Sequence, residues 1–539
     1  MSDIFHDQKS LKWAAALWAV LTFSGVQTLY FFVPSVLMKR ELLAGIFAHL
    51  LHFAFLYLVC HFLHSFWLRR HEALIRRGLY LGALYFALAF VVLVFVWPGL
   101  WSWDDIVVLT GARVYHPTAW QHMFSGFFQQ LALLTLPFPT GVLLIQIFLA
   151  AAVVGYAGAM LGEVTVKTER GRKWFGVGVV CLSLLPPLLM YILAGFRMGI
   201  YSFLELFLLV RIYVWYQQGW TINRKEMLGI AALILLVASW RTEAIFYPVL
   251  IFVPLALMQR TFSRRALSVS LAGVLIVTWG VGMVNSKLIK NNDDYTLLPT
   301  MVGSVELIHQ VKAEQEPEAM AGLGRVLDLN VVRSHPELDG VGLYWEHRPI
   351  LSHTAADKAA YYKSYGYLLR KYPGIVLTKL ENIFWRASGM ARDENGRTQQ
   401  FTVTGNTLSL MNPETAVGEK WANIIGLGKT PWNESLRASV VHLIACEDAD
   451  GRQTFLGLLL YNVWLPIGLA LCCFVLCLVI RHFFEAGIFS LLLARVLTIF
   501  VSEPSPYLMY YLSIYLCAYV LAFTLFVRWL WRRKHHAAA

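Results

Sequence analysis

The stretch that decides the fold is residues 78–105, GLYLGALYFALAFVVLVFVWPGLWSWDD. Residues 78–97 carry no charged side chain, and a helix of this length is about 30 Å long, which matches the hydrocarbon core of a bilayer. A Pro-Gly pair then marks a turn, and two adjacent carboxylates, Asp104 and Asp105, follow within a few residues. The stretch therefore predicts a membrane-spanning helix with an acid pair just beyond its end.

The composition of the whole chain points the same way. Of the 539 residues, 58% are hydrophobic and 14% are charged, and the mean hydropathy is +0.57. These values exclude an ordinary soluble enzyme and indicate a polytopic membrane protein. We expect an all-α fold with about 12 transmembrane helices, because apolar runs of about 17–25 residues follow one another. The runs lie near residues 13–34, 43–66, 78–97, 140–162, 174–194, 199–216, 226–240, 243–258, 266–285, 454–480, 483–502 and 508–530.

The charges of the connections predict how the chain crosses the membrane. Arginine or lysine residues follow every even-numbered span, and examples are Arg69, Lys167, Arg224, Arg260 and Arg481. Under the positive-inside rule, both termini and these connections lie in the cytoplasm. The net charge of +12 is therefore a topology signal that needs no nucleic-acid partner. Contact of these loops with anionic membrane lipids is a secondary role.

Two outward-facing segments stand out by their length. The first, residues 98–139, carries the acid pair and belongs to an N-terminal transmembrane module, which we assign to residues 1–285. The second, residues 286–452, is polar, contains helical patterns and is long enough for a mainly helical outer domain. Residues 453–539 then form the C-terminal transmembrane helices.

An amphipathic helix is predicted after the acid pair, over residues 117–131 (PTAWQHMFSGFFQQL). Apolar side chains recur there at three- and four-residue spacing, polar ones take the opposite side, and Pro117 suits the first turn. The pattern favours a helix that lies flat at the membrane interface with its aromatic face in lipid. A buried re-entrant helix fits the pattern almost as well.

The acid pair lies where the polar head of a membrane-anchored substrate would sit. A carboxylate at this depth can take a proton from an attacking hydroxyl, and it can alternatively hold a divalent cation such as Mg²⁺ or Mn²⁺. The structural alternative is helix or turn capping, because aspartate is favoured at the ends of helices. The residues alone leave these roles open for Asp104 and Asp105.

Three strings resemble motifs of the GT-C membrane glycosyltransferases. They are PGLWSWDD with the later YHP (98–105, 115–117), WRTEA (240–244) and EPSPYLMYYLSIYL (503–516). Their order, the long first outer loop and the later outer domain are similar to bacterial relatives of the protein O-mannosyltransferases and of the lipid A aminoarabinose transferase. The resemblance covers the organisation of residues 75–285 and 500–530, while residues 286–452 match nothing in that family.

The resemblance implies a sugar donor carried on a polyprenyl phosphate or diphosphate, and an active site on the outer side of the membrane. Asp104 takes the position of the family's catalytic acid, and Asp105 is kept as a second catalytic candidate. The residues expected to bind the phosphate or the substrate are His116, Arg197, Arg241, Glu243, Arg386, Glu503 and Tyr507.

Two positions depart from the family pattern. Many members carry Lys-Asp or a second acid at the next outer turn, where this chain reads AGFRMGIYS (194–202), and the charge of Arg197 suits direct phosphate binding. No arginine precedes Tyr507 in the final motif. Separately, Glu205 falls in the middle of a span, where an ionisable residue is a functional candidate unless an internal partner explains it.

Together these features predict a glycosyltransferase of the bacterial inner membrane that acts at the periplasmic face on an envelope glycan or glycolipid acceptor. No resident cofactor is expected beyond the divalent metal already considered. The alternatives are an O-antigen polymerase or ligase, a transporter or flippase for lipid-linked sugars, and a non-enzymatic assembly or sensor protein. A transporter should show two related halves with charges near mid-membrane, whereas the charges here cluster on the outer side.

Overall fold

The computed structural model describes residues 8–23, 39–113, 122–219, 224–241, 247–251, 264–288, 293–394, 397–400, 404–424, 428–448 and 450–536. Within these ranges the chain is helical, and extended residues pair only as three isolated bridges. Seven helices are long and apolar enough to cross a membrane. The prediction of an all-α, multi-pass membrane protein is confirmed at this level.

The candidate spans cover Ile46–Leu68, Ala73–Phe95, Pro139–Thr165, Arg197–Gln217, Phe455–Val479, Phe483–Ser502 and Leu508–Arg533. An eighth is present if a bent pair, Glu169–Ser183 with Pro186–Ile192, counts as one span. The sequence predicts about 12. Apolar helices also cover the expected spans near 226–240 and 266–285, but these helices, Glu226–Trp240 and Leu271–Ser286, are shorter than the seven candidates. Parts of the expected spans near 13–34 and 243–258 lie outside the described residues.

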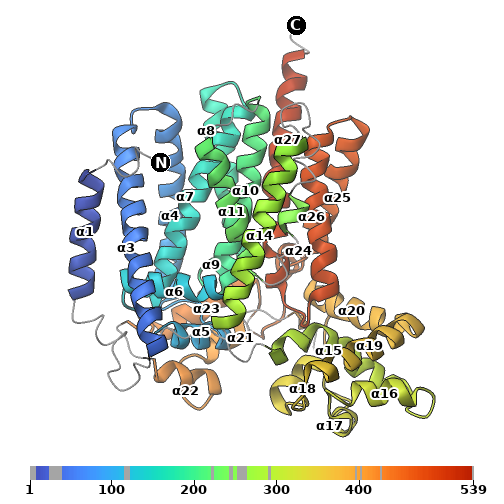
Figure 1. Ribbon diagram of the computed structural model, residues 1–539. Helices are drawn as coiled ribbons and strands as arrows, with labels where there is room; N and C mark the ends of the chain where they lie inside the picture. Colours follow the sequence, from blue (N-terminus) through green and yellow to red (C-terminus); the bar gives the residue numbers. More distant parts are fainter. Residues whose placement is uncertain are drawn as a thin grey trace.

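The long helices form one bundle (Figure 1). Its members are α1 (Gln8–Phe23), α3 (Lys39–Leu68), α4 (Ala73–Phe95), α7 (Pro139–Thr165), α8 (Glu169–Ser183), α10 (Arg197–Gln217), α11 (Arg224–Trp240), α14 (Arg264–Leu288), α25 (Trp464–Val479), α26 (Phe483–Ser502) and α27 (Leu512–His536). Helices α4 and α7 approach each other closely, since a Cβ on Gly155 would collide with the carbonyl oxygen of Gly78. Small residues permit such contacts between membrane helices.

The predicted span near 174–194 is broken in the structure. Helix α8 ends at Ser183, and α9 (Pro186–Ile192) continues at an angle of 68°. Two adjacent prolines cause the break, because proline has no amide hydrogen and its ring clashes with the preceding turn. The Gln146 side chain of α7 donates to three main-chain carbonyls at the end of α9, at 2.9–3.3 Å. These bonds satisfy carbonyls that the short helix leaves free.

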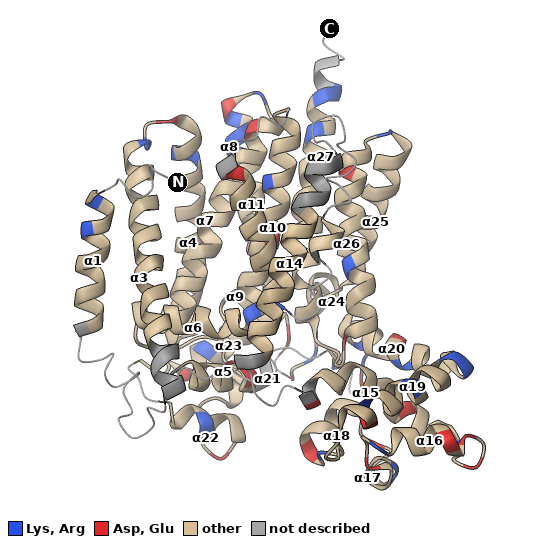
Figure 2. Ribbon diagram, in the orientation of Figure 1, with Lys and Arg blue, Asp and Glu red and all other residues tan. Residues whose placement is uncertain are grey.

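The two ends of the bundle differ in charge (Figure 2). The connections α3–α4, α7–α8, α10–α11 and α25–α26 lie at one end, near both ends of the described chain, and they carry the basic residues used to predict topology. We call this the basic end. The loop with Asp104 and the segment after α14 lie at the other end, which we call the acid end. The structure thus separates the two kinds of connection.

The segment 286–452 consists of two parts. Its first helices are α15 (Asp293–Gln310), α16 (Pro317–Leu323), α17 (Leu329–Ser334), α18 (Gly340–Glu346), α19 (Ala355–Lys371) and α20 (Pro373–Ala387), which share a core of their own around Leu297, Leu323 and Tyr361. The second part contains α21 (Thr404–Ser409), α22 (Ala416–Ala422) and α23 (Glu434–Ala445), and α24 (Phe455–Leu460) follows it. Trp421 and Val441 of this part belong to the core of the membrane bundle.

Candidate functional site

The turn between α4 and the acid pair is fixed by its neighbours. Gly99 has a φ of +117°, a conformation that side chains rarely adopt, and a Cβ there would collide with Leu143 of α7. The next amide, that of Leu100, donates to the carbonyl of Leu193 at the end of α9 (2.8 Å). Helices α7 and α9 therefore set the direction in which the chain enters the acid pair.

The outer segment also holds this turn. Arg437 of α23 is 3% exposed and donates through Nη2 to the carbonyls of Gly99 (3.1 Å) and Thr407 (3.0 Å). The Trp97 indole donates to the carbonyl of Gly428 (2.7 Å). A buried guanidinium that binds two main-chain carbonyls is a strong positional constraint. Residues more than 300 positions apart in the chain are thus joined at the base of the site.

The two carboxylates have different environments. Asp105 is 2% exposed, and its Oδ2 accepts hydrogen bonds from the amide (3.2 Å) and the hydroxyl (3.0 Å) of Ser102. Since α5 (Trp103–Arg113) begins directly after Ser102, Asp105 closes the first turn as an acidic residue does in a capping box. Asp104 lies one position earlier and is half-buried. The capping alternative thus describes Asp105.

The acidity of Asp104 is set by burial and by Arg197. Burial raises the pKa of Asp104 above its ordinary value, and the nearby Arg197 guanidinium acts in the opposite direction. Arg197 is the first residue of α10, so the partial positive charge of the helix N-terminus adds to its own. For Asp105, burial and the charge of Asp104 raise the pKa well above its ordinary value. The pair therefore combines a capping acid with a less buried acid that faces a cation.

Arg241 joins the ends of two helices at the same place. It follows α11 directly, is 1% exposed, donates to the sulfur of Met198, and lies with its guanidinium carbon 4.9 Å from the centre of the Tyr510 ring. The Trp240 indole donates to the carbonyl of Arg197 (3.1 Å). Burial, and then the like charge of Arg197, lower the pKa of Arg241 to about 9, which leaves it charged at neutral pH. Two guanidiniums are therefore held close together.

Glu503 also lies near Arg241. It caps the C-terminus of α26 and is 3% exposed. Burial raises its pKa well above the ordinary value, while the Tyr511 hydroxyl and the Arg241 guanidinium favour its charged form. The half-buried Tyr507 packs edge-on against Tyr510, with ring centroids 6.1 Å apart. The segment 503–516 and the segment 240–244 thus come into contact through Arg241, Tyr510 and Glu503.

The structure adds a histidine that sequence reasoning missed. His122 is 8% exposed and forms the N-cap of α6 (Met123–Thr135), with its Nδ1 accepting from the amide of Phe124 at 3.4 Å. Burial, and then the charge of Arg197, lower its pKa to about 4, so it is neutral at physiological pH. The sequence did contain a signal for this residue, because His122 directly precedes the strongly apolar residues that form α6.

Helix α6 differs from the expected surface helix. It begins at Met123 rather than Pro117, and residues 114–121 lie outside the described residues. Its polar side chains Ser125 and Gln129 are 2% and 4% exposed, and the Gln129 amide donates to the carbonyl of Gly195 (3.1 Å). The polar side therefore packs against the α9–α10 turn instead of facing solvent.

The remaining predicted residues are His116, Glu243 and Arg386. His116 and Glu243 lie outside the described residues. Arg386 is half-buried near the end of α20, two residues after Phe384, whose ring centroid is 5.5 Å from that of Tyr511. The structure thus places Arg386 in the last turn of α20, on the lobe formed by α15–α20 (Figure 1).

The mid-span Glu205 has a partner inside the bundle. Its Oε2 lies 3.8 Å from Nε of Arg495 on α26, and the two residues are 0% and 1% exposed. The Arg495 guanidinium lies 5.3 Å from the centre of the Tyr201 ring, one helical turn before Glu205. Internal charge pairing therefore accounts for Glu205.

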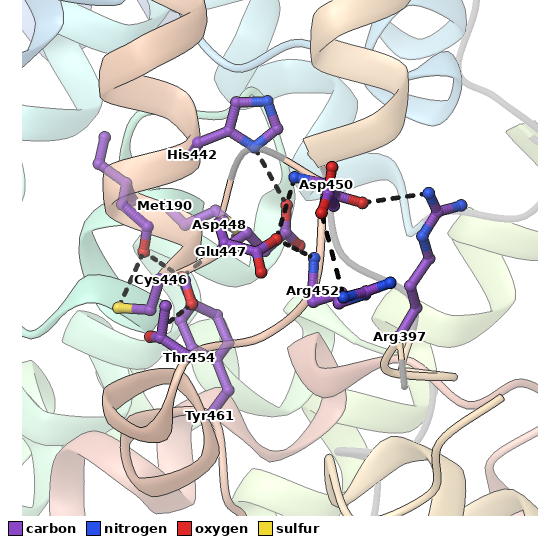
Figure 3. A network of polar contacts seen from close by, with 11 residues as sticks. Met190, Arg397, His442, Cys446, Glu447, Asp448, Asp450, Arg452, Thr454 and Tyr461 are labelled. Atoms are coloured by element: carbon purple, nitrogen blue, oxygen red, sulfur yellow. Dashed lines mark hydrogen bonds and ion pairs between the residues drawn. The ribbon is translucent and has the colours of Figure 1, made fainter. Parts of the chain in front are cut away.

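A second acidic group stabilises the connection between α23 and α24 (Figure 3). Asp448 accepts from the amides of Asp450 (3.0 Å) and Arg452 (2.8 Å), which forms a tight turn, and His442 lies 3.5 Å from Glu447. The hydroxyl of Tyr461 donates to the carbonyl of Ile444 (2.8 Å) close to Met190 of α9. This network fixes α23, and hence Arg437, against the bundle.

The acid end therefore gathers opposite charges from segments distant in sequence. The start of α5 and the end of α26 supply three carboxylates, Asp104, Asp105 and Glu503. The start of α10 and the end of α11 supply two guanidiniums, Arg197 and Arg241. We call Asp104, Arg197, Arg241 and Glu503 the charge cluster. Such a cluster can bind an anionic group at the guanidiniums and transfer a proton at Asp104. In the described part of the chain, no three or more Asp, Glu, His or Cys side chains are arranged to hold a metal ion.

Comparisons of the chain with models of protein families, with curated proteins and with solved structures found no match.

Proposed function

We propose that the protein is an integral membrane glycosyltransferase of the GT-C type, which transfers a sugar from a polyprenyl-phosphate-linked donor to an envelope glycan or glycolipid. The observation that carries the proposal is the charge cluster. Asp104 and two buried or half-buried guanidiniums converge at one end of a membrane bundle. Glycosyl transfer from a lipid phosphate needs a base and a phosphate-binding site at this depth.

Asp104 is the proposed general base. The acceptor hydroxyl attacks the anomeric carbon of the sugar, its proton passes to Asp104, and the bond from that carbon to the phosphate oxygen breaks. A carboxylate whose pKa is raised is a better base than an ordinary aspartate, and Asp104 has that property through burial. Asp105 serves as the cap that orients the first turn of α5.

Arg197 and Arg241 are the proposed binding groups for the departing phosphate. Negative charge grows on the phosphate oxygen as the bond breaks, and fixed cations stabilise it without further reorganisation. Arg241 is held by Met198, Tyr510 and the neighbouring Trp240. The N-terminus of α10 also favours a bound anion. His122, being neutral, is available as a hydrogen-bond donor to the donor sugar or phosphate.

The two ends of the bundle indicate which side of the membrane the charge cluster faces. If the basic end faces the cytoplasm, the charge cluster faces the periplasm, where polyprenyl-phosphate sugars are used. The second part of segment 286–452 is anchored to the acid end through Arg437. We assign the α15–α20 lobe to acceptor selection. About 12 spans and the inner membrane of a bacterium complete the proposal.

The test compares surface glycans and lipid-linked sugars of cells with the wild-type gene and with its deletion. The proposal expects the deletion to remove one sugar from an envelope glycan or glycolipid and to accumulate its lipid-linked donor. Loss of whole oligosaccharides instead of one sugar would identify a polymerase or ligase. Unchanged glycans and unchanged donor lipids would contradict the proposed function.

A further inference from the structure

A cavity of about 830 Å³ opens between α25, α27 and the end of α8. Its walls are formed by hydrophobic side chains such as Leu469, Leu476 and Phe526, and its volume is typical of a ligand site. Residues Phe455–Val479 and Leu508–Arg533, which include α25 and most of α27, are candidate membrane spans. The apolar part of the cavity therefore lies at the depth of lipid acyl chains.

One end of this cavity is basic. His482, Arg528 and Arg532 line it, next to the α25–α26 turn and near the end of α27, which places it at the basic end of the bundle. Arg528 bonds to Glu485 (3.1 Å) and to the hydroxyl of Tyr213 (3.0 Å), whereas Arg532 is exposed. One carboxylate thus opposes two guanidiniums, and the net charge offered to a ligand is positive.

An exposed tryptophan marks the height of the membrane surface beside the basic groups. Trp529 lines the cavity and is 52% exposed, and the guanidinium of Arg533 lies 5.4 Å from the centre of its ring. Tryptophan is enriched at the level of lipid headgroups. Basic pockets between membrane helices at this level bind the headgroups of anionic lipids. The apolar walls of the cavity match the acyl chains of such a lipid, and the arginines at its end match the anionic headgroup.

We propose that this cavity binds one anionic diacyl phospholipid of the surrounding bilayer. Its acyl chains lie between α25 and α27, and its phosphate lies beside Arg532 and His482. The cavity is at the opposite end of the bundle from the charge cluster, so its occupant is distinct from a sugar donor bound near Arg241. The proposal is independent of the proposed function.

The test uses the full-length protein in lipid nanodiscs made of phosphatidylcholine with about 20 mol% phosphatidylglycerol as the anionic lipid. Native mass spectrometry counts the lipids that stay bound after release from the nanodisc. We expect one phosphatidylglycerol to be retained by the wild type. Arg532→Gln should reduce its retention about fivefold, because a basic residue near the headgroup contributes about 1 kcal/mol.

A second variant and a control separate a lipid site from general charge effects. Cys473→Trp fills the apolar part of the cavity and should also reduce retention. Arg170→Gln removes an exposed basic residue in the first turn of α8, which does not line the cavity, and should retain phosphatidylglycerol as the wild type does. Circular dichroism confirms that each variant is folded. Retention of the two lipids in the proportion in which the nanodisc contains them, or wild-type retention of phosphatidylglycerol by both cavity variants, would overturn the proposal.

Discussion

The two ends of the bundle use charged residues in different ways. At the basic end, Arg77 donates to Glu163 (3.1 Å) and Glu169 (2.7 Å), and Arg172 pairs with Glu163 (2.9 Å). Both carboxylates are at least one-third exposed, and each has a direct cationic partner close in space. This network joins α4, α7 and α8, and its charges are fully used in holding those helices together.

At the acid end, buried charges are brought together at a higher energetic cost. Arg241 and Glu503 are 1% and 3% exposed, and a second guanidinium acts unfavourably on Arg241. Two cations held near each other in a buried place repel each other, and here the carboxylates of Asp104 and Glu503 lie close enough to offset part of that repulsion. The basic end therefore stabilises the fold, whereas the buried charges of the acid end are the ones that we propose bind the substrate.

The largest effect is expected from Asp104→Asn. The amide cannot accept the proton of the acceptor hydroxyl, so the transfer rate should fall by about 10²–10⁴-fold. The matched control is Asp105→Asn, which changes the neighbouring carboxylate but keeps an oxygen that can accept from Ser102. The control should lose about 1 kcal/mol of stability and retain most activity. Transfer is measured as restoration of the missing sugar in the deletion strain. Equal loss of activity in the two variants would contradict the different roles of the two acids.

The next effect is expected from Arg241→Lys. The lysine keeps the buried charge but loses the planar guanidinium, so the rate should fall by about 10²-fold, with the protein still folded. Arg211→Lys is the matched control, because Arg211 lies toward the basic end and bonds to Glu226 and Tyr156. The control should change the rate less than about threefold. Similar losses of transfer rate in Arg241→Lys and Arg211→Lys would contradict the different roles of the acid end and the basic end.

The acidity of Asp104 predicts the pH dependence of the transfer. The base must be deprotonated, so activity is present at high pH and is lost as pH falls through the raised pKa of Asp104. The loss should begin above about pH 3.9, the ordinary value for aspartate, and approach tenfold per pH unit. The rate is measured between about pH 4 and 8 in proteoliposomes whose donor is saturating. A rate that stays constant down to about pH 4 would argue against a buried aspartate as the base.

The smallest effect concerns the basic end. Arg77→Gln removes the shared partner of Glu163 and Glu169, and it should lower the stability of the protein by about 1–2 kcal/mol. Thermal unfolding in detergent reports this as a lower Tm. The transfer rate per folded molecule should be unchanged. A loss of rate without a loss of stability would mean that the basic end also takes part in the reaction.

The sequence predicted the acid end in outline. Charge alternation placed the loops with Asp104, Arg197 and Arg241 on one side of the membrane, and the structure brings these residues together. The sequence left capping open for both acids, and the structure assigns it to Asp105. The signal was present, because Ser102 and Asp105 have the spacing of a capping box. Short motifs with a local physical meaning were therefore predictable.

Features that depend on tertiary packing were not predicted. His122 enters the group through its cap on α6 and its proximity to Arg197, which periodicity does not encode. The hydrogen bonds from Arg437 to the carbonyls of Gly99 and Thr407 form only when α23 is in its folded position. The break between α8 and α9 was signalled by Pro186 and Pro187, yet the hydropathy of the run hid it. Hydropathy counts apolar length and does not weigh lost hydrogen bonds.

The most direct test of the account is conversion of the accumulated donor by purified protein. Lipid-linked sugars are extracted from the deletion strain and incubated, with the envelope glycan of that strain, with proteoliposomes of wild-type or Asp104→Asn protein. Mass spectrometry then follows the donor lipid and the acceptor. We expect the wild type to release the polyprenyl phosphate or diphosphate and to extend the acceptor by one sugar, while Asp104→Asn does neither. Donor consumption at equal rates by the two proteins, or none by the wild type, would contradict the assignment of the acid end as the reaction centre.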